Sequence, residues 1–473
     1  MYFSKNNKYS YSIIIIFISF FISILVSNYN LNNYDKVIDD KNGSYHQMIK
    51  SDAYRYLSHG ADIKKELDNN INFFETGREN FTKYLPPRIA ALIFTIFDIE
   101  LYKNFETKEL NTGVYKPYLY IQCIIYFLSV LFFYGLCKPN FNKKALDYTI
   151  LFLCLEPTIF QYHGTFWSES YFFSFQIIII GLILSNKDNS FIFILIGFFV
   201  GLLCLQKQYA IFYIIPVIIF CTFFTSNKKS LTLLSLILGF SITQIFVGYN
   251  NFKRAGVFYI IANDNNIAIH LDLVPKVINK IKGYSGKEFV EYEGAIMKDW
   301  MIENSIVFDE KSESLITSKH WMRYRNSIVD ENDKLKFDKK LRSRTLEYFK
   351  EYPLEFASVI IKNGLHMTLL NPFHIYSDHK FKSGEIYYIS KKHNELIPYR
   401  IIYTLIIYIL CLYGFYLLIL EKNYWILSIL LISILYFYLL SFWHGNTRYF
   451  VPAYLYFAFF FGKALEKLTV KIK

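Results

Sequence analysis

Cysteine is scarce in this sequence of 473 residues, and its placement excludes two kinds of site. All six cysteines fall within or at the ends of apolar runs, and the polar stretches contain none. No two are spaced as metal ligands, so the pattern favours thiols packed in a core or against lipid over a disulfide framework or a cysteine metal site. The six are Cys123, Cys137, Cys154, Cys204, Cys221 and Cys411.

Repeats and processing signals are also missing. No period of 20–50 residues recurs and no low-complexity tract stands out, which excludes a repeat architecture. The first apolar run, Tyr11 to Ser27, follows Lys5 and Lys8 but lacks a small-x-small cleavage site. We therefore expect a retained signal-anchor helix instead of a cleaved signal peptide.

Apolar residues are abundant instead, at 53% hydrophobic and 20% aromatic. Because about 20 apolar residues span a bilayer, the runs predict an all-α polytopic membrane protein with about ten transmembrane helices. The expected spans are 11–27, 117–137, 147–162, 166–185, 190–206, 208–225, 231–248, 398–420, 424–442 and 447–464.

The net charge of +12 indicates how the chain is oriented in the membrane and does not indicate nucleic-acid binding. Its lysines gather in alternate short turns, such as 138–144 and 227–229, whereas the turns at 163–165 and 443–446 carry no Lys or Arg. The positive-inside rule then places both termini in the cytoplasm. Two large regions, 28–116 and 249–397, face outward.

The expected organisation has three parts: an N-terminal transmembrane module at 1–248, an outer region at 249–397, and C-terminal spans at 398–473. Within the outer region, Glu331 to Tyr352 predicts a charged helix stopped by Pro353. Leu354 to Leu370 is apolar but contains charged and polar residues, so we expect it to lie in the membrane interface.

The first outer region contains the sequence SDAYRY at residues 51–56. Asp52 and Tyr56 are four residues apart and share one face of an expected amphipathic helix beside the membrane. An aspartate there suits a general base that removes a hydroxyl proton. A helix N-cap is the structural alternative for Asp52, and the Asp39–Asp40 pair is a rival base, although its Asn-Gly neighbour indicates a turn.

Four charged residues mark the other predicted outer-face positions. Glu169 begins a span with His163 just before it, and an ionisable group there is costly unless it is paired or faces a polar cavity. Arg88, Lys207 and Arg448 lie at expected helix ends, where each could anchor to headgroups or bind a phosphate. Carboxylates and cations gathered on one side of an apolar bundle suit chemistry on an anionic, lipid-linked sugar.

These motifs together resemble the GT-C superfamily of membrane glycosyltransferases, in particular bacterial enzymes related to aminoarabinose transferases and protein O-mannosyltransferases. Asp52 with Tyr56 looks like the catalytic aspartate in the first outer loop of those enzymes. YLPP at 84–87 is similar to the Tyr-Pro-Pro motif that commonly follows that aspartate. FWSESYF at 166–172, GFFVGL at 197–202 followed by Lys207, and RYFVP at 448–452 are similar to further segments of those enzymes. Ala53 and Leu455 depart from the family patterns.

The resemblance implies an inverting glycosyltransferase in the bacterial cytoplasmic membrane, with its active site facing the periplasm. Asp52 would be the base, with Lys207, Arg448 and Arg88 at the donor phosphate and Glu169, Tyr56 and His163 at the substrate. The implied donor is a polyprenyl-phosphate sugar, and the acceptor a glycan, lipid or protein hydroxyl. Some relatives use a divalent metal ion, but no ligand cluster in this sequence demands one.

Two other functions remain open at this point. An O-antigen-type polymerase has similar outer loops but needs no acidic helix after the first span. A lipid-linked oligosaccharide flippase or other transporter should carry ionisable residues near the bilayer midplane and show repeat symmetry.

Overall fold

The computed structural model describes most of the chain. The described residues are 10–38, 52–76, 84–104, 109–110, 115–185, 188–225, 228–256, 258, 260, 270, 273–308, 327–372, 397–441 and 447–471.

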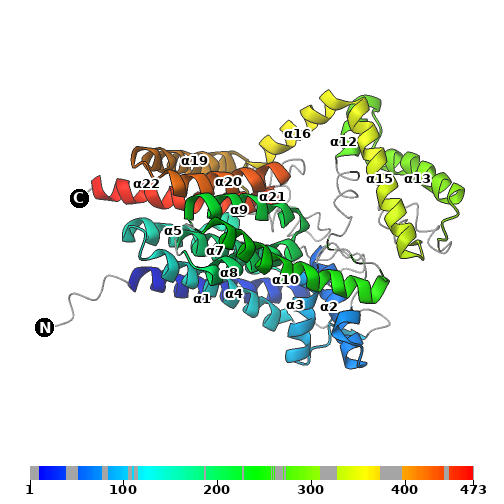
Figure 1. The fold of residues 1–473 in the computed structure, drawn as a ribbon, viewed down its shortest axis with the longest axis horizontal. Helices are drawn as coiled ribbons and strands as arrows, with labels where there is room; N and C mark the ends of the chain where they lie inside the picture. The colour runs from blue at the N-terminus through cyan, green and yellow to red at the C-terminus, as the bar shows by residue number, and fades with distance from the viewer. Residues whose placement is uncertain are drawn as a thin grey trace.

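Nine of the described helices run along the long axis and form one bundle (Figure 1). Four helices there are long and apolar enough to cross a membrane, and shorter apolar helices accompany them. The chain is therefore a membrane protein, while the count of ten spans stays a prediction. The nine are α1 (Ser10–Ile38), α4 (Tyr115–Cys137), α5 (Lys143–Leu155), α7 (Glu169–Leu184), α8 (Ser190–Gln206), α10 (Lys229–Ala255), α19 (Ile397–Leu420), α20 (Tyr424–Ser441) and α22 (Phe457–Lys471).

Three predicted spans are not continuous helices, which corrects the sequence-based boundaries. The span at 147–162 divides at Glu156, whose side chain caps the short helix α6 (Pro157–Phe160). The span at 447–464 divides into α21 (Thr447–Tyr454), which contains Pro452, and α22. The span at 208–225 is a series of short pieces, namely the 3₁₀ turn η4 (Gln208–Tyr213), α9 (Ile214–Phe220) and the π-helical turn η5 (Cys221–Thr225).

Close helix packing in the bundle depends on glycine. A Cβ atom on Gly197 would lie 2.1 Å from the Leu236 carbonyl oxygen, and one on Gly201 would lie 1.9 Å from Thr243 Oγ1. These contacts show that α8 and α10 run parallel and approach through backbone atoms, as small-residue interfaces do in membranes. All six cysteines are buried, which confirms the expected packing role.

The two outer regions lie at the end of the bundle away from both termini (Figure 1). Two short strands pair antiparallel there, a small departure from the all-α expectation. The first region contains α2 (Asp52–Asp68), the 3₁₀ turn η2 (Phe73–Glu75), α3 (Leu85–Ile96), β1 (Tyr102–Asn104) and β2 (Glu109–Leu110). The second contains α12 (Val274–Lys282), α13 (Gly286–Glu303), α15 (Glu331–Glu351) and α16 (Pro353–Met367).

A buried ion network ties the second outer region together. Glu293 on α13 is fully buried and accepts hydrogen bonds from Arg344 at 2.6 Å and from the Tyr348 hydroxyl, both on α15. His270 packs nearby, with its Nε2 atom 3.8 Å from Glu293. Burial lowers the pKa of His270 to about 3, and the Arg344 charge acts in the same direction. The imidazole is therefore neutral at physiological pH.

The end of α16 is fixed to the bundle by α19. The Arg400 side chain donates to the carbonyl oxygens of Leu369 and Leu370, at 3.2 and 3.1 Å. The Thr404 hydroxyl accepts from the Leu370 backbone N–H at 3.1 Å. These contacts satisfy backbone groups at the point where the outer region joins the bundle.

The predicted orientation can be tested by cysteine labelling. Ser285 on the second outer region and Asn142 in the turn before α5 are both exposed, whereas the native cysteines are buried and should give little background. A membrane-impermeant thiol reagent should label Ser285→Cys in intact cells, after permeabilisation of any outer membrane, and should not label Asn142→Cys. The reverse pattern would place the outer regions in the cytoplasm. Ser312, another expected outer position, lies outside the described residues.

Candidate functional site

The structure brings Glu169, Lys207 and Arg448 together in one buried group, which we call the Glu169 group. The Lys207 ammonium lies 2.7 Å from Glu169 Oε1, and the Arg448 Nε–H donates to the same oxygen. The exposed fractions of Glu169, Lys207 and Arg448 are only 0%, 3% and 5%. One carboxylate thus faces two cations, which leaves the three side chains with a net charge of +1 when all are ionised.

Helix ends position this group. Glu169 is the first residue of α7, Lys207 caps the C-terminus of α8, and Arg448 is the second residue of α21. The N-terminal end of α7 is a favourable place for a carboxylate, because the helix dipole is positive there. The Gln206 side chain donates to the Ser168 carbonyl oxygen at 2.9 Å, which joins the end of α8 to the start of α7.

Aromatic rings surround the two cations. The Arg448 guanidinium lies over Trp167, 3.5 Å from the ring centroid. The Lys207 ammonium is 5.4 Å from the Phe172 ring and 5.9 Å from the Tyr449 ring. Such cation–π contacts offset part of the cost of burying the charges.

A single apolar cluster connects the Glu169 group to the helix that carries Asp52. Trp167, which stacks on Arg448, packs in this cluster with Leu57 of α2, Phe94 of α3 and Tyr118 of α4. The start of α7 and the first turns of α2 are therefore parts of one packed unit.

Asp52 is the first residue of α2, and its side chain lies outside the described residues, so both the base and the N-cap stay predictions. Tyr56, one turn later, is 1% exposed. At Gly60, a Cβ atom would come 2.6 Å from Ala90 Cβ, so α2 crosses α3 at close range. This close crossing fixes the direction of α2, while the roles of Asp52 and Tyr56 stay predictions. The rival pair Asp39 and Asp40 lies outside the described residues.

His163 is buried beside the start of α7. Its Nδ1 atom lies 2.9 Å from the Ser170 hydroxyl, and its ring is 3.7 Å from the Tyr126 ring. Within the described residues its Nε2 atom has no hydrogen-bond partner. His163 thus adjoins the residue that follows Glu169 without a contact to the carboxylate itself being described.

Arg88 has a different environment from the other two cations. Its guanidinium donates to the Thr76 carbonyl oxygen at 3.1 Å and to the Asn250 side chain at 3.0 Å, and it stacks on Tyr84 at 3.6 Å. These contacts join the first outer region to α10. No described contact links Arg88 to the Glu169 group.

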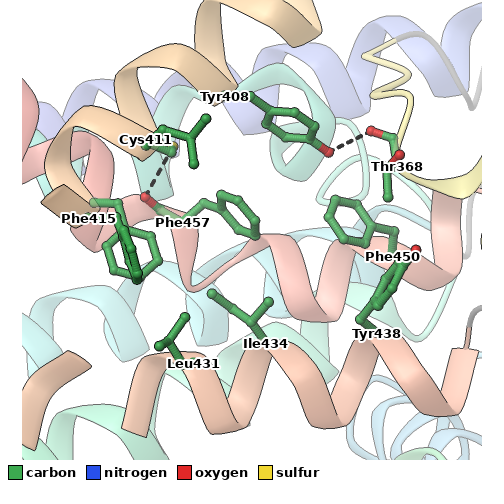
Figure 2. A pocket seen from close by; sticks show the side chains of 11 residues that line it. Thr368, Tyr408, Cys411, Phe415, Leu431, Ile434, Tyr438, Phe450 and Phe457 are labelled. Carbon is green, nitrogen blue, oxygen red and sulfur yellow. Dashed lines mark hydrogen bonds between the residues drawn. The ribbon is translucent and has the colours of Figure 1, made fainter. Parts of the chain in front are cut away.

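An apolar cavity of about 440 Å³ opens between α19, α20 and the α21–α22 segment (Figure 2). Phe450, which lies two residues after Arg448 on α21, points into it together with Tyr408 and Phe457. The Tyr408 hydroxyl donates to the Thr368 carbonyl oxygen at 2.6 Å. A cavity of this size and lining suits a hydrocarbon chain.

Sequence reasoning missed three residues that organise these features. Trp167 holds Arg448, Asn250 holds Arg88, and Arg400 holds the end of α16. Only Arg400 carried a usable signal, since an arginine in the first turn of an apolar helix needs a partner. Trp167 and Asn250 resemble ordinary interface residues until their tertiary contacts are seen.

The described residues provide no group of three His, Cys, Asp or Glu side chains that could hold a metal ion. This finding does not cover the side chains of Asp39, Asp40 and Asp52, which lie outside the described residues. Metal dependence therefore stays an open expectation, and no chemical step is assigned to a metal.

No protein-family model matches the sequence. No curated protein matches it either. Among solved structures, the chain is similar to the archaeal oligosaccharyltransferase AglB from Archaeoglobus fulgidus, in complex with an inhibitory peptide and a dolichol-phosphate. The TM-score is 0.48 and the sequence identity 13%, over 97% of this chain and 50% of that protein. The chain thus spans about half the length of the solved protein it matches, and the assignment of the site rests on its own residues.

Proposed function

We propose that this membrane protein is an inverting glycosyltransferase of the GT-C type. It would transfer a sugar from a polyprenyl-phosphate donor to a hydroxyl of a glycan, lipid or protein acceptor, at the outer face of a bacterial cytoplasmic membrane. The observation that carries the proposal is the Glu169 group, in which two buried cations converge from helices distant in sequence. Trp167, which lies over the Arg448 guanidinium, belongs to the same apolar cluster as Leu57 of the helix that begins at Asp52.

The proposed reaction assigns one task to each charged group. The Asp52 carboxylate removes the proton from the acceptor hydroxyl, whose oxygen attacks the anomeric carbon of the donor sugar. The bond from that carbon to the phosphate oxygen breaks, and the polyprenyl phosphate leaves. Lys207 and Arg448 stabilise the charge that develops on the departing phosphate, where electrostatic assistance has its largest effect.

The apolar cavity and Arg88 complete the proposal. The cavity shares α21 with Arg448, so a phosphate held by Arg448 and a hydrocarbon chain in the cavity could belong to one lipid donor. Arg88 would act as a positioning residue, because its described contacts are protein carbonyl, amide and ring groups. Glu169 would hold the two cations in place, and Tyr56 and His163 would shape the substrate site.

A deletion strain combined with a reconstituted assay tests this function. We expect the strain to accumulate a polyprenyl-phosphate sugar and to lose one sugar from a cell-envelope glycan, lipid or protein. The purified protein should transfer that sugar from the accumulated lipid to acceptor extracted from the deletion strain. Accumulation of an unpolymerised lipid-linked repeat unit would instead favour a polymerase, and loss of lipid transport without transfer would favour a flippase.

A further inference from the structure

A second cavity, of about 720 Å³, lies at the end of the bundle that carries the chain termini. Its walls come from the start of α1, the start of α5 and the end of α22, and include Tyr11, Lys143, Lys144 and Thr469. The positive-inside pattern assigns this end to the cytoplasmic side. The cavity is therefore separated from the Glu169 group by the length of the bundle.

Polarity changes along this cavity as it does along a phospholipid. Lys143 and Lys144 form the first turn of α5, and Leu151, another lining residue, lies two turns further along the same helix. On α1, Tyr11 is followed one turn later by Ile15, which also lines the cavity. The cavity thus offers basic groups at the helix ends and apolar side chains deeper in the bundle.

The two lysines form no ion pair with a carboxylate among the described residues. The Lys143 ammonium lies 5.8 Å from the Tyr11 ring. Asp147, one turn after Lys143, instead accepts a hydrogen bond from Ser12. By contrast, Lys463 on α22 is paired with two carboxylates, at 2.7 and 2.8 Å.

We propose that this cavity binds one anionic phospholipid of the cytoplasmic leaflet. Lys143 and Lys144 would contact its phosphate, and its acyl chains would lie against Ile15 and Leu151. Lys143, Lys144 and Asp147 sum to a net charge of +1, which matches a headgroup of charge −1, and basic pockets between helices on this side suit such headgroups. The proposal does not depend on the transferase function.

Native mass spectrometry of the full chain in mild detergent tests the site. Phosphatidylglycerol should form a complex of one lipid with one protein chain. Phosphatidylcholine with the same acyl chains should not form this complex. In the double variant Lys143→Gln/Lys144→Gln, the affinity for phosphatidylglycerol should fall about twenty-five-fold, as two contacts of about fivefold each predict. Lys228→Gln/Lys229→Gln is the matched control, because this lysine pair lies at the start of α10 and does not line the cavity.

Two further variants keep the test decisive if the double glutamine variant fails to fold. Lys143→Arg/Lys144→Arg keeps the charge and should retain binding, whereas Leu151→Trp fills the apolar part and should weaken it. Equal binding of the two lipids, or equal loss in the control pair, would overturn the proposal. Displacement of the lipid by inorganic phosphate at similar concentration would overturn it too, since the cavity would then be a site for a free anion.

Discussion

Replacing Asp52 by asparagine should lower glycosyl transfer at least about a hundredfold while the protein remains expressed and folded. The amide keeps the shape and hydrogen-bonding capacity of the side chain but removes the basic carboxylate, and a general base typically contributes about 10²–10⁴ in rate. Initial rates of sugar transfer from the polyprenyl-phosphate donor measure the effect. The thermal stability of the purified variant shows whether the fold is retained.

The same helix provides a matched control. Asp68→Asn removes a carboxylate at the other end of α2, where Asp68 is exposed and lies 2.7 Å from the Lys64 ammonium. The Lys64 ammonium also lies 3.6 Å from Asp98. A pair with an exposed carboxylate contributes about 0–1 kcal/mol to stability, so this variant should transfer sugar at nearly the normal rate. Normal turnover in Asp52→Asn, with loss in Asp39→Asn or Asp40→Asn, would move the role of base to that pair.

The sequence predicted the helical membrane architecture because long apolar runs have few alternatives. It also located α2, since Ser51 and Asp52 favour a helix start, and it placed the charged helix α15 before Pro353. The breaks within three spans were not visible. At Glu156 the break depends on two contacts of its carboxylate. The carboxylate caps the N-terminus of α6, and it accepts a hydrogen bond from the Tyr403 hydroxyl on the distant helix α19.

The candidate site was predictable as a list of charged residues but not as a set of partners. A buried Glu169 needed a counter-charge, and His163, the neighbour named beside it in the sequence, contacts the Ser170 hydroxyl instead. The two described partners of Glu169, Lys207 and Arg448, lie 38 and 279 positions further along the chain. Only helix packing, through contacts such as the glycines of α8, decides which distant helix ends meet.

The Glu169 group has two competing explanations, a donor-phosphate site and a structural ion pair. Both require Lys207 and Arg448 to lie together, so position alone does not separate them. They differ in what the cations stabilise. In a donor-phosphate site the cations stabilise the phosphate during transfer, whereas in a structural ion pair they stabilise only the packing of α7, α8 and α21. Activity and stability must therefore be measured on the same variants.

Loss of either cation should reduce transfer efficiency about ten- to a hundredfold, because charge-assisted contacts are worth about 1.5–3 kcal/mol each. Lys207→Met and Arg448→Gln test the two contacts through kcat/KM for the donor. Arg448→Lys should recover only part of the loss, since an ammonium lacks the two-pronged geometry of the guanidinium. Glu169→Gln should lower the free energy of unfolding by about 3–5 kcal/mol, because the two buried cations then lose the carboxylate that they share.

The double variant Glu169→Gln/Lys207→Met separates the two explanations. It returns the net charge of the group to +1, so its stability should exceed that of Glu169→Gln alone, as a double-mutant cycle measures. If Lys207 contacts the donor phosphate, transfer should nevertheless stay about ten- to a hundredfold below normal, because the cation is still missing. Recovery of transfer in step with stability would instead identify the group as a structural ion pair. The donor-phosphate assignment of Lys207 would then be wrong, even if Asp52 proved to be the base.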